Sequence, residues 1–129
     1  MRILVVEDEI VLKDLYKQIL EAEKYQVDTA EDGERALAML QEGGYDLVLL
    51  DVKIPKMDGF AVVENLKKNP PKKPNGPIFF LTNSEDEAAI ANSVSLGVQG
   101  YLTKSQFTPD TLVKEVKRIL DTEKSKTAV

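Results

Sequence analysis

Cysteine and histidine are both absent from this sequence of 129 residues. The absence of cysteine excludes disulfide bonds, zinc–thiolate centres, iron–sulfur clusters and thiol nucleophiles within the chain. The absence of histidine removes imidazole from every catalytic or metal-binding role. Site chemistry must therefore come from carboxylates, lysine, arginine, hydroxyl groups and the backbone. Such an oxygen-rich set of ligands favours a hard cation.

Long hydrophobic runs are also missing. The strongest apolar run, residues 47–50, is far shorter than the ~18 residues that would suggest a membrane span. At the N-terminus, the apolar residues 3–6 are too few for the apolar region of a secretory signal. We therefore expect a cytoplasmic protein without membrane association. The formal net charge of −5 also argues against nucleic-acid binding by this domain, because phosphate contacts need concentrated lysine and arginine.

Strand and helix patterns alternate along the chain. Short apolar runs are typical of strands that are buried on both faces, and each is followed by apolar residues at helical spacing. The strand patterns lie at residues 3–6, 26–30, 47–51, 78–82 and 100–103, and the helical patterns lie near 11–20, 36–40, 62–66, 84–96 and 109–120. Parallel strands need crossover helices, so five such units predict a parallel sheet with helices on both faces.

Two architectures are built from repeated strand–helix units. The eight-unit barrel needs roughly 250 residues and is excluded by the length of the chain. We therefore predict an α/β, doubly wound (βα)5 flavodoxin-like fold, with a five-stranded parallel sheet of order 2-1-3-4-5. The domain should cover residues 1–122, and a polar tail, 123–129, is expected to be frayed. In this fold, ligands bind at the carboxyl ends of strands 1 and 3, where the winding reverses.

Three carboxylates follow the strands at this switch point. Glu7 and Asp8 come directly after the first strand, and Asp51 ends the third. Two like charges ~4 Å apart repel by ~4 kcal/mol at an effective dielectric constant of ~20, so the cluster should raise its own pKa values or recruit a cation. Mg²⁺ suits the available ligands. Acidic residues after strands also cap helices or lie in solvent, and this alternative applies to Glu7 alone more than to Asp8 and Asp51 together.

Two further polar residues end strands at the same edge of the predicted sheet. Thr82 ends the fourth strand, and Lys104 follows the fifth. Each is ordinary by itself, because threonine is common in strands and a loop lysine is usually solvated. Beside a carboxylate cluster that holds Mg²⁺, however, a hydroxyl donor and an ammonium form a set that binds anions.

With these residues in place, the sequence resembles the receiver domains of bacterial response regulators over residues 2 to about 121. The ordered set of matching segments is specific, although any one of them would not be. The segments are Val6-Glu7-Asp8-Glu9, Leu50-Asp51, Pro55-Lys56-Met57-Asp58-Gly59, Leu81-Thr82 and Gly100-Tyr101-Leu102-Thr103-Lys104.

The resemblance implies how a phosphoryl group would be received. Asp51 would accept it from a histidine of a sensor kinase or of a phosphotransfer protein. Mg²⁺ would be the cofactor, bound by Asp8, Asp51 and the backbone carbonyl of Lys53, and by Glu7 through water. Lys104 would pair with the phosphoryl oxygens. The domain would promote only its own phosphorylation and dephosphorylation and would not otherwise be an enzyme.

The resemblance also implies how the signal would leave the domain. The Thr82 hydroxyl would donate to a phosphoryl oxygen, and Tyr101 would then move inward. Together these residues would form a switch that changes the face made by the fourth helix, the fifth strand and the fifth helix. A downstream protein target would recognise that face.

Three positions depart from the pattern of the family. Ser105 follows Lys104 where the family usually has proline, often after a cis bond. Asn83 follows Thr82 where the family usually has alanine, and its larger polar side chain is expected to restrict access to the acyl phosphate. Lys53 stands where the family often has methionine, and its ammonium could either approach the acidic site or lie in solvent.

Alternative functions remain open from the sequence. Because the residues after the last helix are too few for an effector domain, we expect a single-domain regulator, although a receiver cut from a larger regulator would look the same. A flavodoxin-like electron carrier shares the sheet order, but Glu7, Asp8 and Glu9 would repel the FMN phosphate. A hydrolase of the haloacid-dehalogenase class needs a second acid two residues after its nucleophile, where this chain has Lys53.

Overall fold

The structure is a computed structural model that describes residues 1–82, 97–106 and 108–127. The strands are β1 (Arg2–Val6), β2 (Gln26–Ala30), β3 (Leu47–Asp51), β4 (Ile78–Thr82) and β5 (Gly100–Thr103). The described helices are α1 (Ile10–Ala22), α2 (Gly33–Glu42), α3 (Gly59–Lys68) and α5 (Pro109–Thr127), and a 3-10 turn, η1 (Lys104–Gln106), follows β5.

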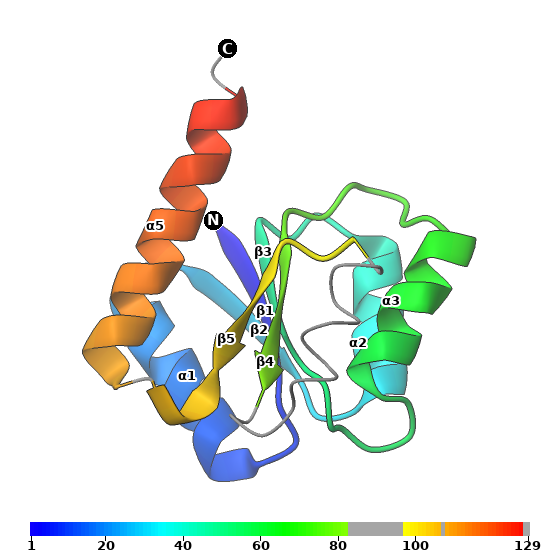
Figure 1. Ribbon diagram of the computed structural model, residues 1–129, viewed down its shortest axis with the longest axis horizontal. Helices are drawn as coiled ribbons and strands as arrows, with labels where there is room; N and C mark the ends of the chain where they lie inside the picture. Colours follow the sequence, from blue (N-terminus) through cyan, green and yellow to red (C-terminus); the bar gives the residue numbers. More distant parts are fainter. Residues whose placement is uncertain (83–96, 107, 128–129) are drawn as a thin grey trace.

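The five strands form one sheet in the order β2-β1-β3-β4-β5, and every neighbouring pair is parallel. Figure 1 shows this sheet between two helical layers, with α1 and α5 on one face and α2 and α3 on the other. The predicted fold class and strand order are therefore confirmed. The polar ends of β1, β3, β4 and β5 meet at one edge, because parallel strands all end on the same side.

Side chains of β1 alternate between the two helical layers. Leu4 and Val6 belong to the cluster that includes residues of α2 and α3, whereas Ile3 and Val5 belong to the cluster with α1 and α5. All four are fully buried, which explains why the strand lacks an alternating polar pattern. Truncating such a leucine to alanine typically costs about 2–5 kcal/mol of stability.

Side-chain caps fix where three helices begin. The Asp32 carboxylate accepts a hydrogen bond from the Arg35 N–H at the start of α2, and Asp58 accepts one from the Ala61 N–H at the start of α3. At the start of α5, the Thr108 hydroxyl accepts one from the backbone N–H three residues later at 3.3 Å. Each cap satisfies a backbone donor that the helix itself leaves free, and typically contributes about 1 kcal/mol.

The C-terminal part of the chain differs from the sequence-based prediction. Helix α5 continues to Thr127, so residues 123–127 extend the helix where a frayed tail was expected. Polar residues continue a helix readily once a packed amphipathic segment has nucleated it. The helix predicted between Ser84 and Gly97 falls on residues 83–96, which lie outside the described residues. Among the described helices, none has both the length and the apolar character that a membrane crossing requires.

Candidate functional site

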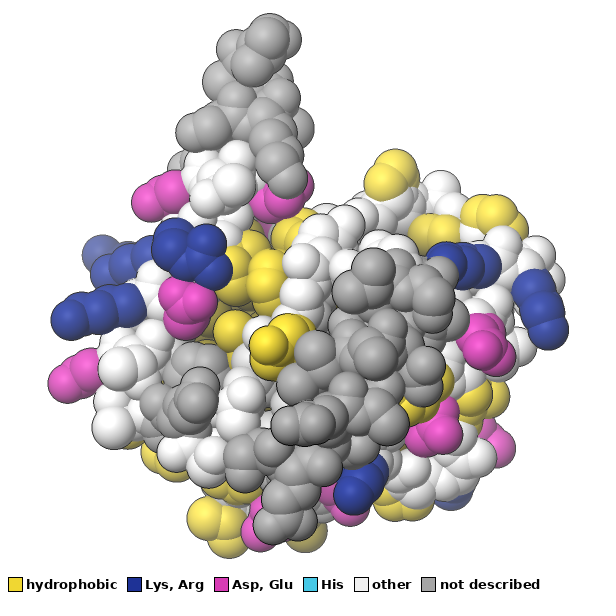
Figure 2. Space-filling view, viewed as in Figure 1, with side chains coloured by type: hydrophobic (Ala, Val, Ile, Leu, Met, Phe, Trp, Pro, Cys, Tyr) yellow, Lys and Arg dark blue, Asp and Glu magenta, His cyan; other side chains and the backbone are white. Residues whose placement is uncertain are grey.

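Hollows occur at both ends of the sheet. One of ≈ 150 Å³ lies between α5 and the sheet edge, where Figure 2 shows hydrophobic side chains at the surface. Its lining includes Phe79 and Gln99, which lie at the amino ends of β4 and β5. The cleft at the carboxyl ends measures ≈ 450 Å³ and is lined by Glu7, Asp8, Glu9, Leu12, Asp51, Lys53, Lys104 and Ser105. Of the polar residues singled out from the sequence, Glu7, Asp8, Asp51, Lys53 and Lys104 thus line this cleft, whereas Thr82 is not among its lining residues.

Two buried carboxylates form the floor of this cleft. Asp51 is the last residue of β3 and is 5% exposed, and Glu7 directly follows β1 and is 1% exposed. The register pairs Val6 with Leu50, so Glu7 and Asp51 occupy the next positions of neighbouring strands. The Glu7 N–H continues the β1–β2 ladder by donating to the Ala30 carbonyl at 3.0 Å, which holds its backbone in place.

Lys104 joins the two carboxylates. Its ammonium donates to Asp51 Oδ2 at 2.6 Å and to Glu7 Oε2 at 2.8 Å. The lysine reaches them from η1 at the end of β5, so three segments that are far apart in the sequence meet here. Charge-assisted hydrogen bonds of this length are among the stronger polar contacts in proteins.

Protonation of the cluster follows from burial and from these contacts. Burial, followed by the hydrogen-bonding contact with Asp51, raises the pKa of Glu7 to about 8 from an ordinary value of 4.5. Burial lowers the pKa of Lys104, but hydrogen bonds to Asp51 and Glu7 outweigh burial, and the net pKa is raised. In the metal-free protein near neutral pH, a proton on Glu7 and the charge of Lys104 therefore both reduce the repulsion between carboxylates.

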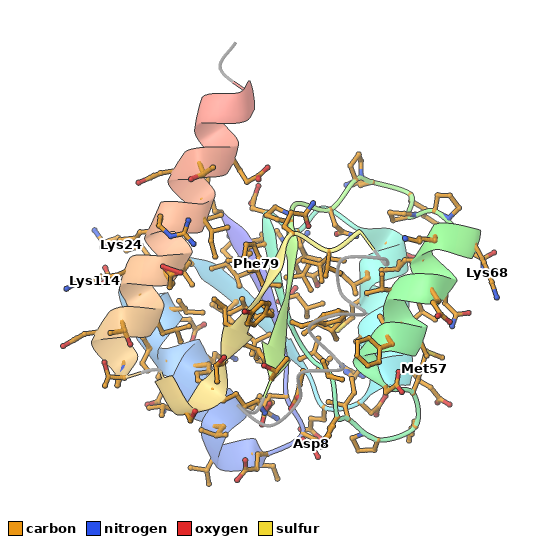
Figure 3. The ribbon with its side chains drawn as sticks, viewed as in Figure 1. Asp8, Lys24, Met57, Lys68, Phe79 and Lys114 are labelled. Carbon is orange, nitrogen blue, oxygen red and sulfur yellow. The ribbon has the colours of Figure 1, made fainter. Side chains whose placement is uncertain are left out.

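The acidic residues fit a small divalent cation. Glu7, Asp8 and Asp51 each offer one carboxylate oxygen, and these three oxygens lie within 4.8 Å of one another. Glu7 Oε1 is buried and has no hydrogen-bond partner within the described part of the chain, which is costly unless a water or an ion satisfies it. Asp8 is exposed at the mouth of the cleft (Figure 3). A set of oxygen ligands with room for water matches the preference of Mg²⁺.

Lys53 contributes to the site through its backbone. Its N–H donates to Asp51 Oδ1 at 3.2 Å, so both oxygens of Asp51 accept hydrogen bonds. The side chain of Lys53 is exposed and its residue lines the cleft. The proposed use of its carbonyl as a metal ligand stays a prediction.

Thr82 and Tyr101 lie on adjacent strands, as expected. The Thr82 hydroxyl is buried at the end of β4 and has no hydrogen-bond partner among the described residues. Tyr101, by contrast, is 43% exposed. In the register of the two strands, Tyr101 pairs with Phe80, and Thr82 pairs with Thr103, the residue before Lys104. An unpaired donor therefore lies one strand away from Asp51 and one strand away from an exposed tyrosine.

Comparison with known families agrees with this geometry. The family model of the response regulator receiver domain matches residues 3–117, which is most of the chain. The chain belongs to this family. A CheY-like receiver domain protein from Methanospirillum hungatei has a structure similar to this receiver domain, with a TM-score of 0.84 and 30% sequence identity over 97% of each chain.

Curated relatives of the receiver domain are regulatory proteins. It is 39% identical to the alkaline phosphatase synthesis transcriptional regulatory protein PhoP and 37% identical to the transcriptional regulatory protein ResD, both from Bacillus subtilis. Each match covers 92% of this chain and 48% of the relative. The receiver domain thus spans about half the length of the curated relatives it matches.

The positions that depart from the family pattern have different outcomes. The described residues contain no cis peptide bond, so the bond between Lys104 and Ser105 is trans, and Lys104 still reaches both carboxylates. Asn83 lies outside the described residues.

Asp58, the nearest other acid in the loop after Asp51, uses its carboxylate to cap α3.

Sequence reasoning did not assign a role to Glu9, Leu12 or Ser105, which also line the cleft of the receiver domain. Glu9 and Ser105 adjoin residues that were singled out, so neighbourhood in the sequence was an available signal. Leu12 lies on α1 and had been interpreted only as part of a helical pattern. Its place at the cleft depends on how α1 packs, which the local sequence does not specify.

Proposed function

We propose that this chain is the phosphorylatable receiver of a two-component phosphorelay, and that Asp51 accepts the phosphoryl group from a histidine of a sensor kinase or phosphotransfer protein. The observation that carries the proposal is the placement of Lys104 between Asp51 and Glu7 in an acidic cleft. Asp51 is both accessible from this cleft and held by two donors, which orients it for in-line attack.

The reaction is one phosphoryl transfer. A carboxylate oxygen of Asp51 attacks the phosphorus of the donor phosphohistidine, a P–O bond forms and the P–N bond breaks. The leaving imidazole nitrogen takes up a proton. Lys104 stabilises the charge on the equatorial oxygens and then pairs with the phosphoryl group, and this electrostatic support is what most phosphoryl-transfer sites provide. The domain therefore needs no nucleophile beyond its own carboxylate.

We propose Mg²⁺ as the cofactor, held by Asp8, Asp51 and the Lys53 carbonyl, with Glu7 acting through water. Bound there, the ion supplies positive charge beside the phosphoryl oxygens. The buried, unpaired Glu7 Oε1 and the three convergent oxygens support this assignment. Binding should displace the proton from Glu7, because a metal ligand or its bridging water requires an ionised acceptor.

The response to phosphorylation would begin at Thr82. A phosphoryl group on Asp51 adds about 1.5–2 negative charges and three strong acceptors. The buried Thr82 hydroxyl, which has no hydrogen-bond partner among the described residues, ends the strand next to β3 and could donate to this group. Its movement would change the packing at Tyr101 and thereby the face formed by strand β5, α5 and the helix predicted at 84–96. A downstream protein target would bind this face in one state more tightly than in the other.

Helix α1 offers a docking surface for the phosphodonor. Ile10 is 62% exposed, Val11 79% and Leu15 40%, which is unusual for large apolar side chains within two turns of one helix. This helix also carries Leu12 into the lining of the cleft. We assign the exposed apolar face to the donor protein, because Leu12 of the same helix lines the cleft that holds Asp51.

The output of the whole protein is a separate proposal. PhoP and ResD are named as transcriptional regulatory proteins, and each is about twice the length of the matching region. For this chain we propose a receiver domain over residues 1–122 that acts in the cytoplasm through protein–protein contact. It would use no nucleic acid or membrane contact of its own.

The proposed function is tested by adding a small phosphodonor and Mg²⁺ to the purified chain. We expect the chain to take up one phosphoryl group, which base removes, and to take up none without Mg²⁺. Uptake that persists when Mg²⁺ is chelated would show that the reaction does not need the metal. Stoichiometric uptake by Asp51→Asn would show that Asp51 is not the acceptor.

A further inference from the structure

The loop between β3 and α3, residues 52–58, follows Asp51 directly. Its Lys53 N–H donates to Asp51 Oδ1 at 3.2 Å. At the far end of the loop, the Gly59 N–H donates to the Val52 carbonyl at 2.9 Å, and a Cβ on Gly59 would lie 2.8 Å from the Asp51 carbonyl oxygen. The backbone shape of this loop therefore decides how the Asp51 carboxylate is presented to the cleft.

The outer part of this loop packs against the first turn of α2. Gly33 begins α2 and donates its N–H to the Pro55 carbonyl at 3.2 Å. A Cβ on Gly33 would lie 1.8 Å from the Met57 carbonyl oxygen. Because that atom belongs to the backbone, it cannot rotate away as the end of a side chain could. Lys56 Nζ also lies 3.7 Å from Asp32 Oδ2, so the loop contacts the cap of the same helix.

The loop conformation depends on these surroundings. Lys56 has a φ of 69°, in the left-handed region that residues other than glycine seldom adopt. Such conformations persist where neighbouring structure holds them. The Pro55 carbonyl accepts from both Gly33 and Met57, so one acceptor joins the turn inside the loop to the start of α2. Figure 3 shows Met57 in this loop at the same end of the molecule as Asp8.

We propose that Gly33 is a positioning residue for the phosphoacceptor site: the first turn of α2 fixes the β3–α3 loop, and through it the Lys53 backbone and the Asp51 carboxylate. This inference rests on the proposed function of Asp51. A side chain at position 33 would push the loop away from α2 and disturb the contact between Lys53 and Asp51. Both Mg²⁺ binding and phosphoryl uptake would then suffer, although no atom of Gly33 lines the cleft.

The test compares Gly33→Ala with Gly76→Ala. A Cβ on Gly76 would lie 2.1 Å from the Asp46 carbonyl oxygen, a similar clash with backbone at the opposite end of the sheet. Both variants should unfold at lower urea concentration. Only Gly33→Ala should shift the metal-free amide resonances of Asp51 and Lys53, and only it should weaken Mg²⁺ binding, by about tenfold or more, as when a residue supporting a metal ligand is lost.

Two results would overturn the positioning role. One is an equal loss of Mg²⁺ affinity in Gly76→Ala, and the other is unchanged affinity in a folded Gly33→Ala. If Gly33→Ala does not fold, Asp32→Ala loosens the same turn, and Glu31→Ala serves as its charge-matched control. The proposal then requires a larger loss of Mg²⁺ affinity for Asp32→Ala than for Glu31→Ala. If the unaltered chain binds no Mg²⁺ and takes up no phosphoryl group, the proposed function fails, and the metal-free amide shifts test the positioning alone.

Discussion

The Lys104 ammonium lies 2.6 Å from Asp51 Oδ2, reaching across β4 from the end of β5 to the end of β3. The same nitrogen contacts Glu7 Oε2 at 2.8 Å. In the metal-free site, Lys104 therefore supplies part of the positive charge that a divalent cation would bring to these carboxylates. The two cations act on the same carboxylates, and this competition leads to the first prediction.

Replacing Lys104 with glutamine should strengthen Mg²⁺ binding. A positive charge ~4 Å from another is worth ~4 kcal/mol of repulsion at an effective dielectric constant of ~20. Solvent and protonation of Glu7 reduce this, so we expect the dissociation constant to fall about tenfold, equivalent to ~1.4 kcal/mol. Calorimetric titration at pH 8 measures it. Lys114→Gln, which changes an exposed lysine on α5 (Figure 3), should have no effect, and weaker binding in Lys104→Gln would contradict the account.

Without Mg²⁺, Lys104→Gln should also be less stable. The substitution leaves Asp51 and Glu7 buried without their shared cation, and removing one partner of a buried ion pair typically costs about 3–5 kcal/mol. Urea unfolding should show the loss in a chelator and a smaller loss in excess Mg²⁺. A loss that is the same in both conditions would mean that the lysine stabilises the fold by packing alone.

Thr82→Ala should separate phosphorylation from its readout. Asp51 remains intact, so the variant should still take up one phosphoryl group. The amide and ring resonances of Tyr101 should, however, respond far less to a phosphoryl mimic than in the unaltered chain. Thr29→Ala on β2 is the control, since β2 lies on the other side of β1 from β3. A full Tyr101 response in Thr82→Ala, or equal shifts in α2 and β5, would refute the proposed coupling.

Val11→Asp should slow transfer from a phosphorylated donor protein by about tenfold or more, because a charge placed in a packed apolar contact costs well over 1.4 kcal/mol. Val11 is the most exposed of the large apolar residues on α1. Uptake from a small phosphodonor should stay within about twofold, since it needs no docking surface. Ala38→Asp, on the exposed side of α2, should leave both rates unchanged. Equal slowing with the small donor would place the defect in the cleft rather than at a docking surface.

Tyr45 provides a pH-dependent signature of the fold. Burial, followed by its hydrogen bond to Asp28, raises the pKa of Tyr45 to about 12 from an ordinary value of 10. Between these values the unfolded chain loses this proton while the folded chain keeps it, so stability present below pH 10 is lost as pH approaches 12. Ultraviolet titration should show a late component that Tyr45→Phe removes. If Asp28→Asn leaves this component unmoved, the Asp28 hydrogen bond does not contribute and burial alone raises the pKa of Tyr45.

The positions of the strands and the charged residues of the cleft could be predicted because both depend on short-range signals. Buried runs mark the strands; Asp51 ends one of them, and Glu7 and Lys104 directly follow two others. The contact between Gly33 and Met57 could not be predicted, since it depends on how two loops pack across the edge of the sheet. The C-terminal extension of α5 was also missed, because residues 123–127 carry no apolar pattern and continue the helix only by propagation.

The most direct test of the account is the mass of the intact protein after incubation with a small phosphodonor and Mg²⁺. The unaltered chain and Asp58→Asn should each gain one base-labile phosphoryl group, because asparagine can still cap α3. Asp51→Asn should gain none, although it should remain folded. If Asp51→Asn gains a phosphoryl group as fully as the unaltered chain, Asp51 is not the acceptor and the central claim is wrong.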